Sequence, residues 1–302
     1  MDFTKARDFI YRNARPLDLA RWRFHFENGN EDEVLNALAV YQNEDGGFAH
    51  ALEPDCWNPL SSPIQTWAAT EILREIRFTD RDHPIVQGIL RYLASGKDSN
   101  GHQWQNTVPT NNDYPHAPWW HWEPSQEITY NPTASLLGFL LVYADKGSSL
   151  YEQACSGVTE AYEYLQQHAT LDAMHTVICY TQLYESLQQA GSGQLLDMAA
   201  FFQQLRSQIR HVLTDDVETW PNSYVCKPSH FIHDRSSAFY PDLHEMCKQE
   251  CAYISRTQLA DGTWNIPWDW AAFPEQWSIS KNWWQADIMI KYIRFFNTFT
   301  GV

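Results

Sequence analysis

The chain has 302 residues, of which 44% are hydrophobic and 15% aromatic, so it can bury a substantial core. Its 37 acidic residues outnumber 21 Lys and Arg residues, and the formal net charge of −16 repels nucleic-acid phosphates and anionic membrane surfaces. No stretch approaches the roughly 20 apolar residues that span a bilayer, and residues 1–8 lack the apolar segment of a signal peptide. We therefore expect a cytoplasmic protein with no nucleic-acid partner and no transmembrane segment.

Apolar residues recur with helical periodicity through nearly the whole chain, and strand signals are sparse. Ser62 and Asn131 each precede a proline, where a side-chain oxygen can cap a helix and the missing proline N–H costs nothing. The sequence therefore predicts an all-α fold. The predicted helices cover residues 3–13, 16–27, 31–42, 62–77, 83–96, 132–146, 148–168, 171–190, 194–213, 232–240, 241–257 and 281–299.

The connections between these helices are of two kinds. Most are short, but those at residues 43–61, 97–130, 214–231 and 258–280 are long. In an up-and-down ring of about six helical hairpins, all four long loops fall at the same end of the ring, where binding residues commonly lie. No Gly/Ser-rich linker divides the sequence, which predicts a single domain of residues 1–302.

A short motif occurs twice, at residues 41–48 (YQNEDGGF) and 256–264 (RTQLADGTW). Each copy follows a helix-periodic stretch and runs from Gln through Asp-Gly to an aromatic residue. The pattern is typical of a helix stop whose ring packs back against the helices. Trp104 and Trp220 occupy related positions in two of the other long loops.

This repeated motif resembles the QW-type repeat of the terpenoid cyclase and protein prenyltransferase superfamily. The stretch from Gly46-Gly47-Phe48 through residues 52–55 to Ser62-Pro63 is also similar to uncharacterised bacterial prenyltransferase-like proteins with one toroid. The resemblance implies an (α/α)6 toroid, in which inner helices ring a central cavity. It further implies carboxylate acid–base chemistry on an isoprenoid or another largely apolar substrate. The Asp-rich acid motif of the class II cyclases is missing from this chain, and the Asp-Cys spacing differs from that of zinc-dependent prenyltransferases.

The first long loop carries two carboxylates, Glu53 and Asp55, beside His50 and Trp57. In an extended segment an i, i+2 pair points to one face, and two close carboxylates raise each other's pKa. Glu53 and Asp55 are therefore candidate catalytic acids, and His50 and Trp57 are candidate substrate-binding residues. The alternative is that the two carboxylates brace the loop or cap the next helix.

The second long loop contains three Trp in four residues, with an imidazole and a carboxylate among them. His121 and Glu123 are candidate general acid–base residues, although a structural hydrogen bond is the alternative for a histidine among rings. The aromatic candidates for substrate binding in this loop are Trp119, Trp120, Trp122 and Tyr130. Such rings can stack on sugars, face an apolar or cationic substrate, or plug the toroid.

The last long loop and the helix after it add Trp268, Asp269, Trp270 and Trp284 to the candidate binding residues. The six cysteines lack CxxC spacing, which predicts reduced and mostly buried thiols. Cys226, His230 and His233 leave a metal open as an alternative, but we expect neither a metal nor an organic cofactor.

Three functional hypotheses follow. The first is a cyclase-like or transferase-like enzyme with an aromatic-lined cavity, and the second is a glycoside hydrolase or polysaccharide lyase, because toroids of helical hairpins also house these. The third is a ligand-binding protein without catalysis. The expected partner is a small molecule or an oligosaccharide, and the sequence leaves the oligomeric state open.

Overall fold

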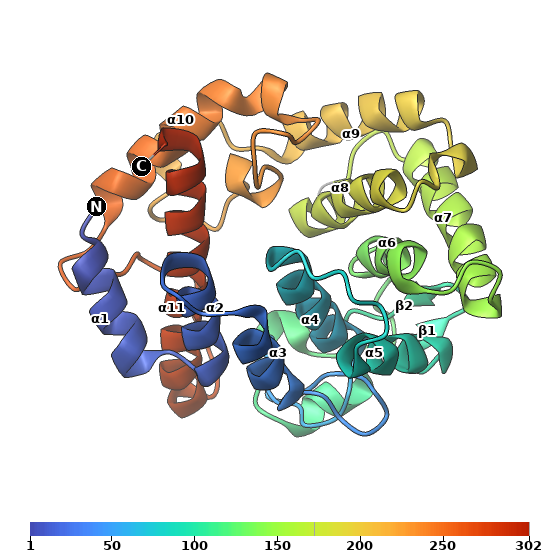
Figure 1. Cartoon of the computed structure of the whole chain (residues 1–302), viewed down its shortest axis with the longest axis horizontal. Coiled ribbons are helices and arrows are strands. Elements are labelled where there is room, and N and C mark those ends of the chain that lie inside the picture. The colour runs from blue at the N-terminus through green and yellow to red at the C-terminus, as the bar shows by residue number, and fades with distance from the viewer. Residues whose placement is uncertain (172, 302) are drawn as a thin grey trace. The chain divides into compact units, whose positions relative to one another are not determined.

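The computed structural model describes residues 1–171 and 173–301. Within this part of the chain there are eleven α-helices and one small antiparallel hairpin, so the predicted all-α class is confirmed (Figure 1). The helices are α1 (Phe3–Asn13), α2 (Pro16–Phe26), α3 (Glu31–Ala39), α4 (Pro63–Glu75), α5 (Pro84–Ala94), α6 (Thr133–Tyr143), α7 (Ser149–Gln167), α8 (Met174–Gln189), α9 (Met198–Val212), α10 (Tyr240–Thr257) and α11 (Pro274–Thr300). The hairpin pairs β1 (Ser99–Asn100) with β2 (Gln103–Trp104).

Two of the predicted helix positions were wrong. Residues 232–239 form turns rather than an α-helix. The Asp234 side chain accepts hydrogen bonds from the backbone N–H and hydroxyl of Ser236, which offers the backbone a local alternative to helix. Helix α11 begins at Pro274 rather than near residue 281, because proline is well suited to a first helical position.

The two predicted helix caps have different outcomes. The Ser62 hydroxyl accepts the N–H of Gln65 at 3.4 Å, and α4 starts with Pro63 as expected. Helix α6 starts at Thr133 with Pro132 at its cap position and no side-chain cap bond, so the predicted Asn131 cap was wrong.

The chain divides into two compact units. Unit 1 comprises Met1–Leu38 and Leu213–Val302, and unit 2 comprises Ala39–Val212. The closed toroid of helical hairpins and the single domain of residues 1–302 stay predictions.

Unit 2 is built around α6, which packs against α7 and α8 (Figure 1). Residues 133–141 of α6 are all buried, as expected for a helix that is apolar on every side. A Cβ added at Gly138 would stand 2.7 Å from the Ser186 hydroxyl, so this glycine permits the close approach of α6 and α8.

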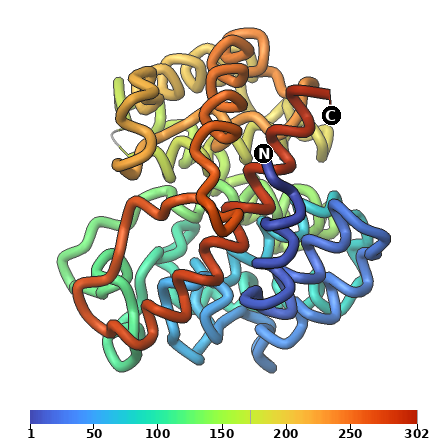
Figure 2. Tube along the Cα trace, turned by 90° about the vertical axis from the view of Figure 1, so that its left-hand side faces the viewer, coloured from blue at the N-terminus to red at the C-terminus, as the bar shows by residue number. Residues whose placement is uncertain are grey.

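Unit 1 brings the two ends of the chain together, with α1, α2 and α10 packed against α11 (Figures 1 and 2). A buried ion network joins α2 to α11. Asp18 pairs with Arg15 at 2.7 Å and with Arg21 at 3.0 Å, and Arg21 also reaches Asp287 at 2.9 Å. Because each buried charge has an opposite partner, the network offsets the cost of removing these groups from water.

The two copies of the repeated motif adopt the same hydrogen-bonding pattern, one copy in each unit. The Gln42 amide donates to the carbonyl oxygens of Gly46 (2.9 Å) and Ile85 (3.1 Å). The Gln258 amide donates to those of Gly262 (3.0 Å) and Asp2 (3.1 Å). Each motif is thus a clamp that fastens its own turn to the start of a helix, α5 in the first copy and α1 in the second.

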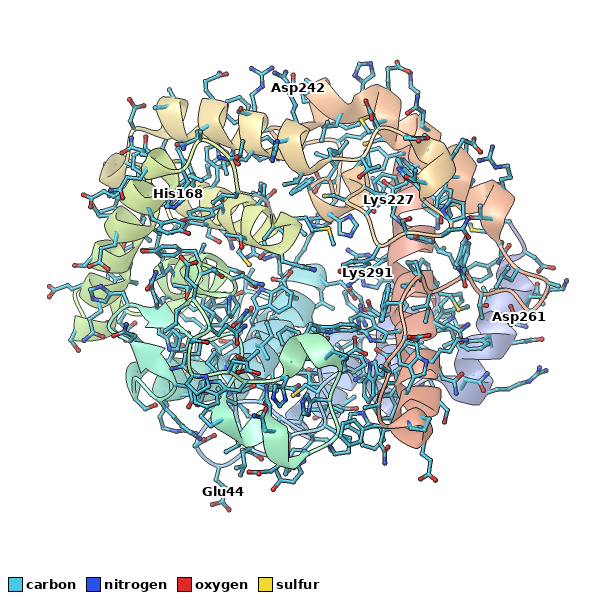
Figure 3. The ribbon with its side chains drawn as sticks, turned by 180° about the vertical axis from the view of Figure 1, so that it is seen from behind. Glu44, His168, Lys227, Asp242, Asp261 and Lys291 are labelled. Carbon is cyan, nitrogen blue, oxygen red and sulfur yellow. The ribbon has the colours of Figure 1, made fainter. Side chains whose placement is uncertain are left out.

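The rest of each motif copy is also alike. The carboxylates of Asp45 and Asp261 each accept a backbone N–H two residues later, at 3.0 Å in both copies. The motif's aromatic residue is buried in each unit, with Phe48 0% exposed and Trp264 1% exposed. Figure 3 labels Glu44 in the first copy of the motif and Asp261 in the second. The expectation that each motif ends with a ring packed into the core is confirmed.

Candidate functional site

The first two long loops of the sequence lie together in unit 2. The N–H of Trp57 donates to the carbonyl of Pro115 at 2.9 Å, and the N–H of Ala117 donates to that of Asp55 at 2.8 Å. An antiparallel bridge pairs Cys56 with His116 between these bonds. We call residues 49–61 and 105–130 the paired loops.

A buried amide network locks the paired loops. Asn58 and Asn111 are both 0% exposed, and the Asn58 amide donates to Asn111 Oδ1 at 3.0 Å and to the hydroxyl of Thr110 at 2.8 Å. The Asn111 amide in turn donates to the carbonyl of Trp120 at 3.0 Å. The backbone of the tryptophan-rich segment is therefore held by a side chain from its own loop, supported by the first loop.

The two candidate carboxylates of the first loop are buried. Glu53 Oε2 accepts the N–H of Asp55 at 2.9 Å, and the backbone N–H of Glu53 donates to Gln65 Oε1 at 2.8 Å. Their charge affects a neighbour: burial, reinforced by Glu53 and Asp55, raises the pKa of the Cys56 thiol to about 12. The bond from Asp55 is the contact that a loop-bracing role requires, and the catalytic role of Glu53 and Asp55 stays a prediction.

The second loop presents a pair of stacked imidazoles. The His116 and His121 rings lie 5.4 Å apart at an interplanar angle of 18°, and His116 Nε2 is 3.2 Å from His121 Nδ1. His116 Nδ1 is 2.6 Å from the carbonyl of Tyr114. Because a carbonyl only accepts, His116 Nδ1 must carry a hydrogen, so neutral His116 accepts at Nε2 from His121 Nδ1–H.

This tautomer assignment leaves His121 Nε2 as the outer end of the pair. It lies 3.8 Å from Glu123 Oε1, and both side chains are exposed. An imidazole that is hydrogen-bonded at one nitrogen and exposes the other has the geometry of a general acid or base. The structure thus brings together His121 and Glu123, and their catalytic role stays a prediction.

The tryptophans around this pair differ in exposure. Trp119 is 43% exposed, whereas Trp57, Trp120 and Trp122 are half-buried. Trp57 Nε1 donates to the carbonyl of Pro54 at 3.2 Å, which anchors that ring to the first loop. Trp119 is therefore the ring with most of its surface available for stacking on a ligand.

The remaining candidates of unit 2 have structural contacts. His50 Nε2 lies 3.0 Å from Asn43 Oδ1, beside the repeated turn. Tyr130 is 4% exposed and packs against the rings of Tyr164 and Tyr180, 5.0 and 5.8 Å away. Burial raises the pKa of Tyr130. Tyr130 thus belongs to the packing between loop and helices, and its predicted binding role is untested.

The candidates of the last long loop form an aromatic cluster in unit 1. The Trp268 ring meets those of Trp284 (5.4 Å) and Tyr224 (5.1 Å) edge to face, and Trp270 lies 5.8 Å from Trp277. Trp270 is 5% exposed and Asp269 is exposed. That all these residues share one end of a toroid with the paired loops stays a prediction.

Unit 1 also contains a buried lysine and glutamate that the sequence did not single out. Lys227 Nζ lies 2.7 Å from the Tyr292 hydroxyl, and it is 5.3 Å from the ring centroid of Tyr253 and 5.2 Å from that of Tyr292. Lys227 is labelled in Figure 3. Glu250 is 0% exposed and accepts the N–H and hydroxyl of Ser229 at 2.8 and 2.5 Å. Burial raises the pKa of Glu250, while Lys227 and Ser229 oppose that rise.

Among residues 1–171 and 173–301, no group of three or more His, Cys, Asp or Glu side chains is arranged to hold a metal ion. His230 Nδ1 lies 3.0 Å from both the N–H and the carbonyl of Lys227, and Cys226 is buried. The alternative metal site at Cys226, His230 and His233 therefore has no support in the described geometry.

The sequence missed His116 as the partner of His121. The two residues are five positions apart, a spacing that brings side chains together only because the segment Pro118–Trp120 turns as a 3-10 helix. Proline after Ala117 was the available signal, since it favours the first position of such a turn.

Compared with models of known protein families, with curated proteins and with solved structures, the chain matches none. The resemblance to the terpenoid cyclase and protein prenyltransferase superfamily therefore stays an expectation. No described helix has both the length and the apolar character needed to cross a membrane.

Proposed function

We propose that the chain is an enzyme that performs acid–base chemistry at the paired loops of unit 2 on a small hydroxylated substrate, such as a neutral oligosaccharide. The observation that carries this proposal is the arrangement of His116, His121 and Glu123 on the loop that also carries the exposed ring of Trp119.

Each residue has a definite role in this proposal. His121 transfers the proton, and Glu123 stabilises the charged imidazole. The hydrogen bond between His116 Nε2 and His121 Nδ1 orients the His121 ring, so that His121 Nε2 faces outward. Trp119 supplies the stacking surface for the apolar face of a sugar ring.

The choice of a hydroxylated substrate over an isoprenoid rests on the surroundings of Trp119. Its ring lies on a loop with exposed imidazole and carboxylate groups, which need hydrogen-bonding partners in a ligand. An isoprenoid chain has no such partners. The net charge of −16 further disfavours anionic sugars.

The test is turnover of a panel of neutral oligosaccharides by the full chain, with cleavage products identified by mass spectrometry. Replacing His121 by Gln should lower turnover by roughly 100- to 10,000-fold without changing the melting temperature. His244→Gln is the matched control, because His244 is an exposed histidine 3.0 Å from Glu245 on α10. Full turnover in His121→Gln, or turnover of isoprenoid substrates alone, would refute the proposal.

A further inference from the structure

Helices α4 and α8 of unit 2 direct polar side chains toward each other. On α4, Trp67, Glu71 and Arg74 are spaced i, i+4 and i+7, which places them on one face of the helix. On α8, Gln182 and Ser186 are spaced i and i+4 on the facing side. We call these five residues the polar face.

Two hydrogen bonds join the two helices across this face. Gln182 Nε2 donates to Glu71 Oε2 at 2.5 Å, and Arg74 Nη2 donates to the Ser186 hydroxyl at 3.5 Å. Glu71 Oε1 and Arg74 Nε form an ion pair at 3.6 Å, a distance too long for a hydrogen bond. The charges of Glu71 and Arg74 therefore largely cancel at the polar face.

Helix α6 packs against both α4 and α8. Cys179 of α8 lies with its thiol 3.7 Å from Asn131 Oδ1 and against the backbone of Ser135. Burial raises the pKa of this thiol, and the charge of Glu71 adds to the rise. The Ser135 hydroxyl, the Cys179 thiol and the carboxylate of Glu71 thus belong to the same neighbourhood.

Several buried atoms here have no hydrogen-bond partner among the described residues. They are the donors Trp67 Nε1 and Arg74 Nε, the acceptor Gln182 Oε1 and the hydroxyl of Ser135. Gln182 is 3% exposed and Ser135 is 0% exposed. Buried polar groups are nearly always hydrogen-bonded in native proteins, so these four atoms offer hydrogen-bonding capacity that a bound molecule can take up.

We propose that the polar face binds a neutral hydroxylated small molecule. Hydroxyl groups donate and accept, so one ligand of this class can satisfy both the two N–H donors and the amide oxygen. Because the charges of Glu71 and Arg74 offset each other, the face has no net charge that would select an anion or a cation over a neutral molecule. The side chains of Glu71 and Arg74 are 29% and 24% exposed, so solvent reaches this face.

The binding site proposed here is formed by residues of α4 and α8 rather than of the paired loops, and it does not rest on the proposed catalysis. Its most direct readout is the indole N–H of Trp67, which gives its own signal in a nitrogen–proton NMR spectrum. Trp67→Phe identifies that signal, because it removes the N–H and keeps an aromatic ring. Adding glucose, cellobiose or myo-inositol to the full chain should shift the Trp67 signal in a saturable way.

Calorimetric titration with the same probes measures their binding affinity. Trp67→Phe and Gln182→Met should each weaken binding of the responsive probe about five- to tenfold, the usual effect of losing one hydrogen bond. Gln188→Met is the matched control on α8, because Gln188 is exposed, and Trp277→Phe is the control for the ring change. His121→Gln should leave the Trp67 response intact, which separates this site from the paired loops.

Two outcomes would overturn the inference. One is a Trp67 signal that no neutral probe moves, or that only phosphate or acetate moves. The other is unchanged affinity in both Trp67→Phe and Gln182→Met. If Gln182→Met does not fold, the Trp67 signal of the unmodified protein still decides between these outcomes.

Discussion

The side-chain amide of Gln42 donates to the carbonyl oxygen of Gly46 at 2.9 Å and so closes the turn that ends the first repeated motif. The second motif contains the same bond between residues 258 and 262, at 3.0 Å. The four-residue spacing from Gln to Gly is therefore set by the span of one side chain across a tight turn. Since both motifs also bind the start of a helix, changes in them should lower the free energy of unfolding more than changes in an exposed turn do.

Gly46→Ala should lower the free energy of unfolding by about 2–5 kcal/mol. The residue has φ +91°, which costs an L-residue about 1–2 kcal/mol, and its new Cβ would lie 2.1 Å from the Gly88 carbonyl, which adds a steric cost. Gly262→Ala should behave alike, since it has φ +94° and a contact of 2.6 Å to the Ala6 nitrogen. Urea denaturation measures both.

The control for these substitutions is Gly101→Ala. Gly101 has φ +66° but no heavy atom within 4 Å of an added Cβ, so only the conformational cost of about 1–2 kcal/mol applies. If Gly46→Ala and Gly101→Ala lowered the free energy of unfolding equally, the close packing of the motif would make no contribution to stability.

Gln42→Ala should destabilise the protein by about 1–3 kcal/mol. The substitution removes two hydrogen bonds, to Gly46 and Ile85, and leaves their carbonyl oxygens half-buried without that donor. Gln188→Ala, at an exposed position of α8, should change stability by less than about 0.5 kcal/mol. Thermal and urea denaturation of both variants measure the difference in stability. A Gln42→Ala protein as stable as the unmodified one would contradict the stabilising role of the clamp.

The structure also separates the two roles left open for Glu53. Because Gln can accept the Asp55 N–H as Glu does, Glu53→Gln should keep the melting temperature near that of the unmodified protein. Glu53→Ala removes the acceptor and should cost about 1–3 kcal/mol. If a stably folded Glu53→Gln protein nevertheless lost turnover by roughly 100-fold, Glu53 would be assigned to catalysis.

Five of the six thiols should resist modification in the native protein at pH 8. Burial raises the pKa of Cys251 to about 11 and of Cys56, Cys226 and Cys247 to about 12, and it raises that of Cys179 as well. A colorimetric disulfide reagent should label half-buried Cys155 first, and Cys155→Ser should abolish this early reaction. Prompt labelling of three or more native thiols would contradict the described burial.

The buried Glu250 should make stability depend on pH. Burial raises its pKa above the value of 4.5 of an exposed glutamate, so the native state holds this proton to higher pH than the unfolded state does. Its contribution to stability is complete below about pH 4.5 and is lost as pH rises through the native pKa.

Glu250→Gln removes this titration. The stability of the unmodified protein relative to Glu250→Gln should therefore fall as pH rises above 4.5. Melting temperatures of both proteins at matched pH values isolate the effect, because every other titrating group is common to both. A relative stability that rises with pH would mean that Lys227 and Ser229 outweigh burial in setting this pKa.

The sequence alone determined the helical class and most helix positions, because apolar periodicity and proline at first helical positions act locally. It also identified the repeated turn, since Gly46 and Gly262 need a backbone conformation that glycine adopts freely. His121 and Glu123 could be named as candidates because both stand among the tryptophans of one loop. Their closeness, 3.8 Å between Nε2 and Oε1, was not predicted.

Only the tertiary structure decided which distant residues meet. The contact of Gln182 with Glu71 joins residues 111 positions apart, and the bridge of Cys56 with His116 joins two separate loops. Such contacts depend on how α4, α6 and α8 pack, which no local pattern encodes. The burial of Glu53 and the hydrogen bond to its carboxylate are of the same kind, because a carboxylate's surroundings follow from the whole fold and not from its neighbours in sequence.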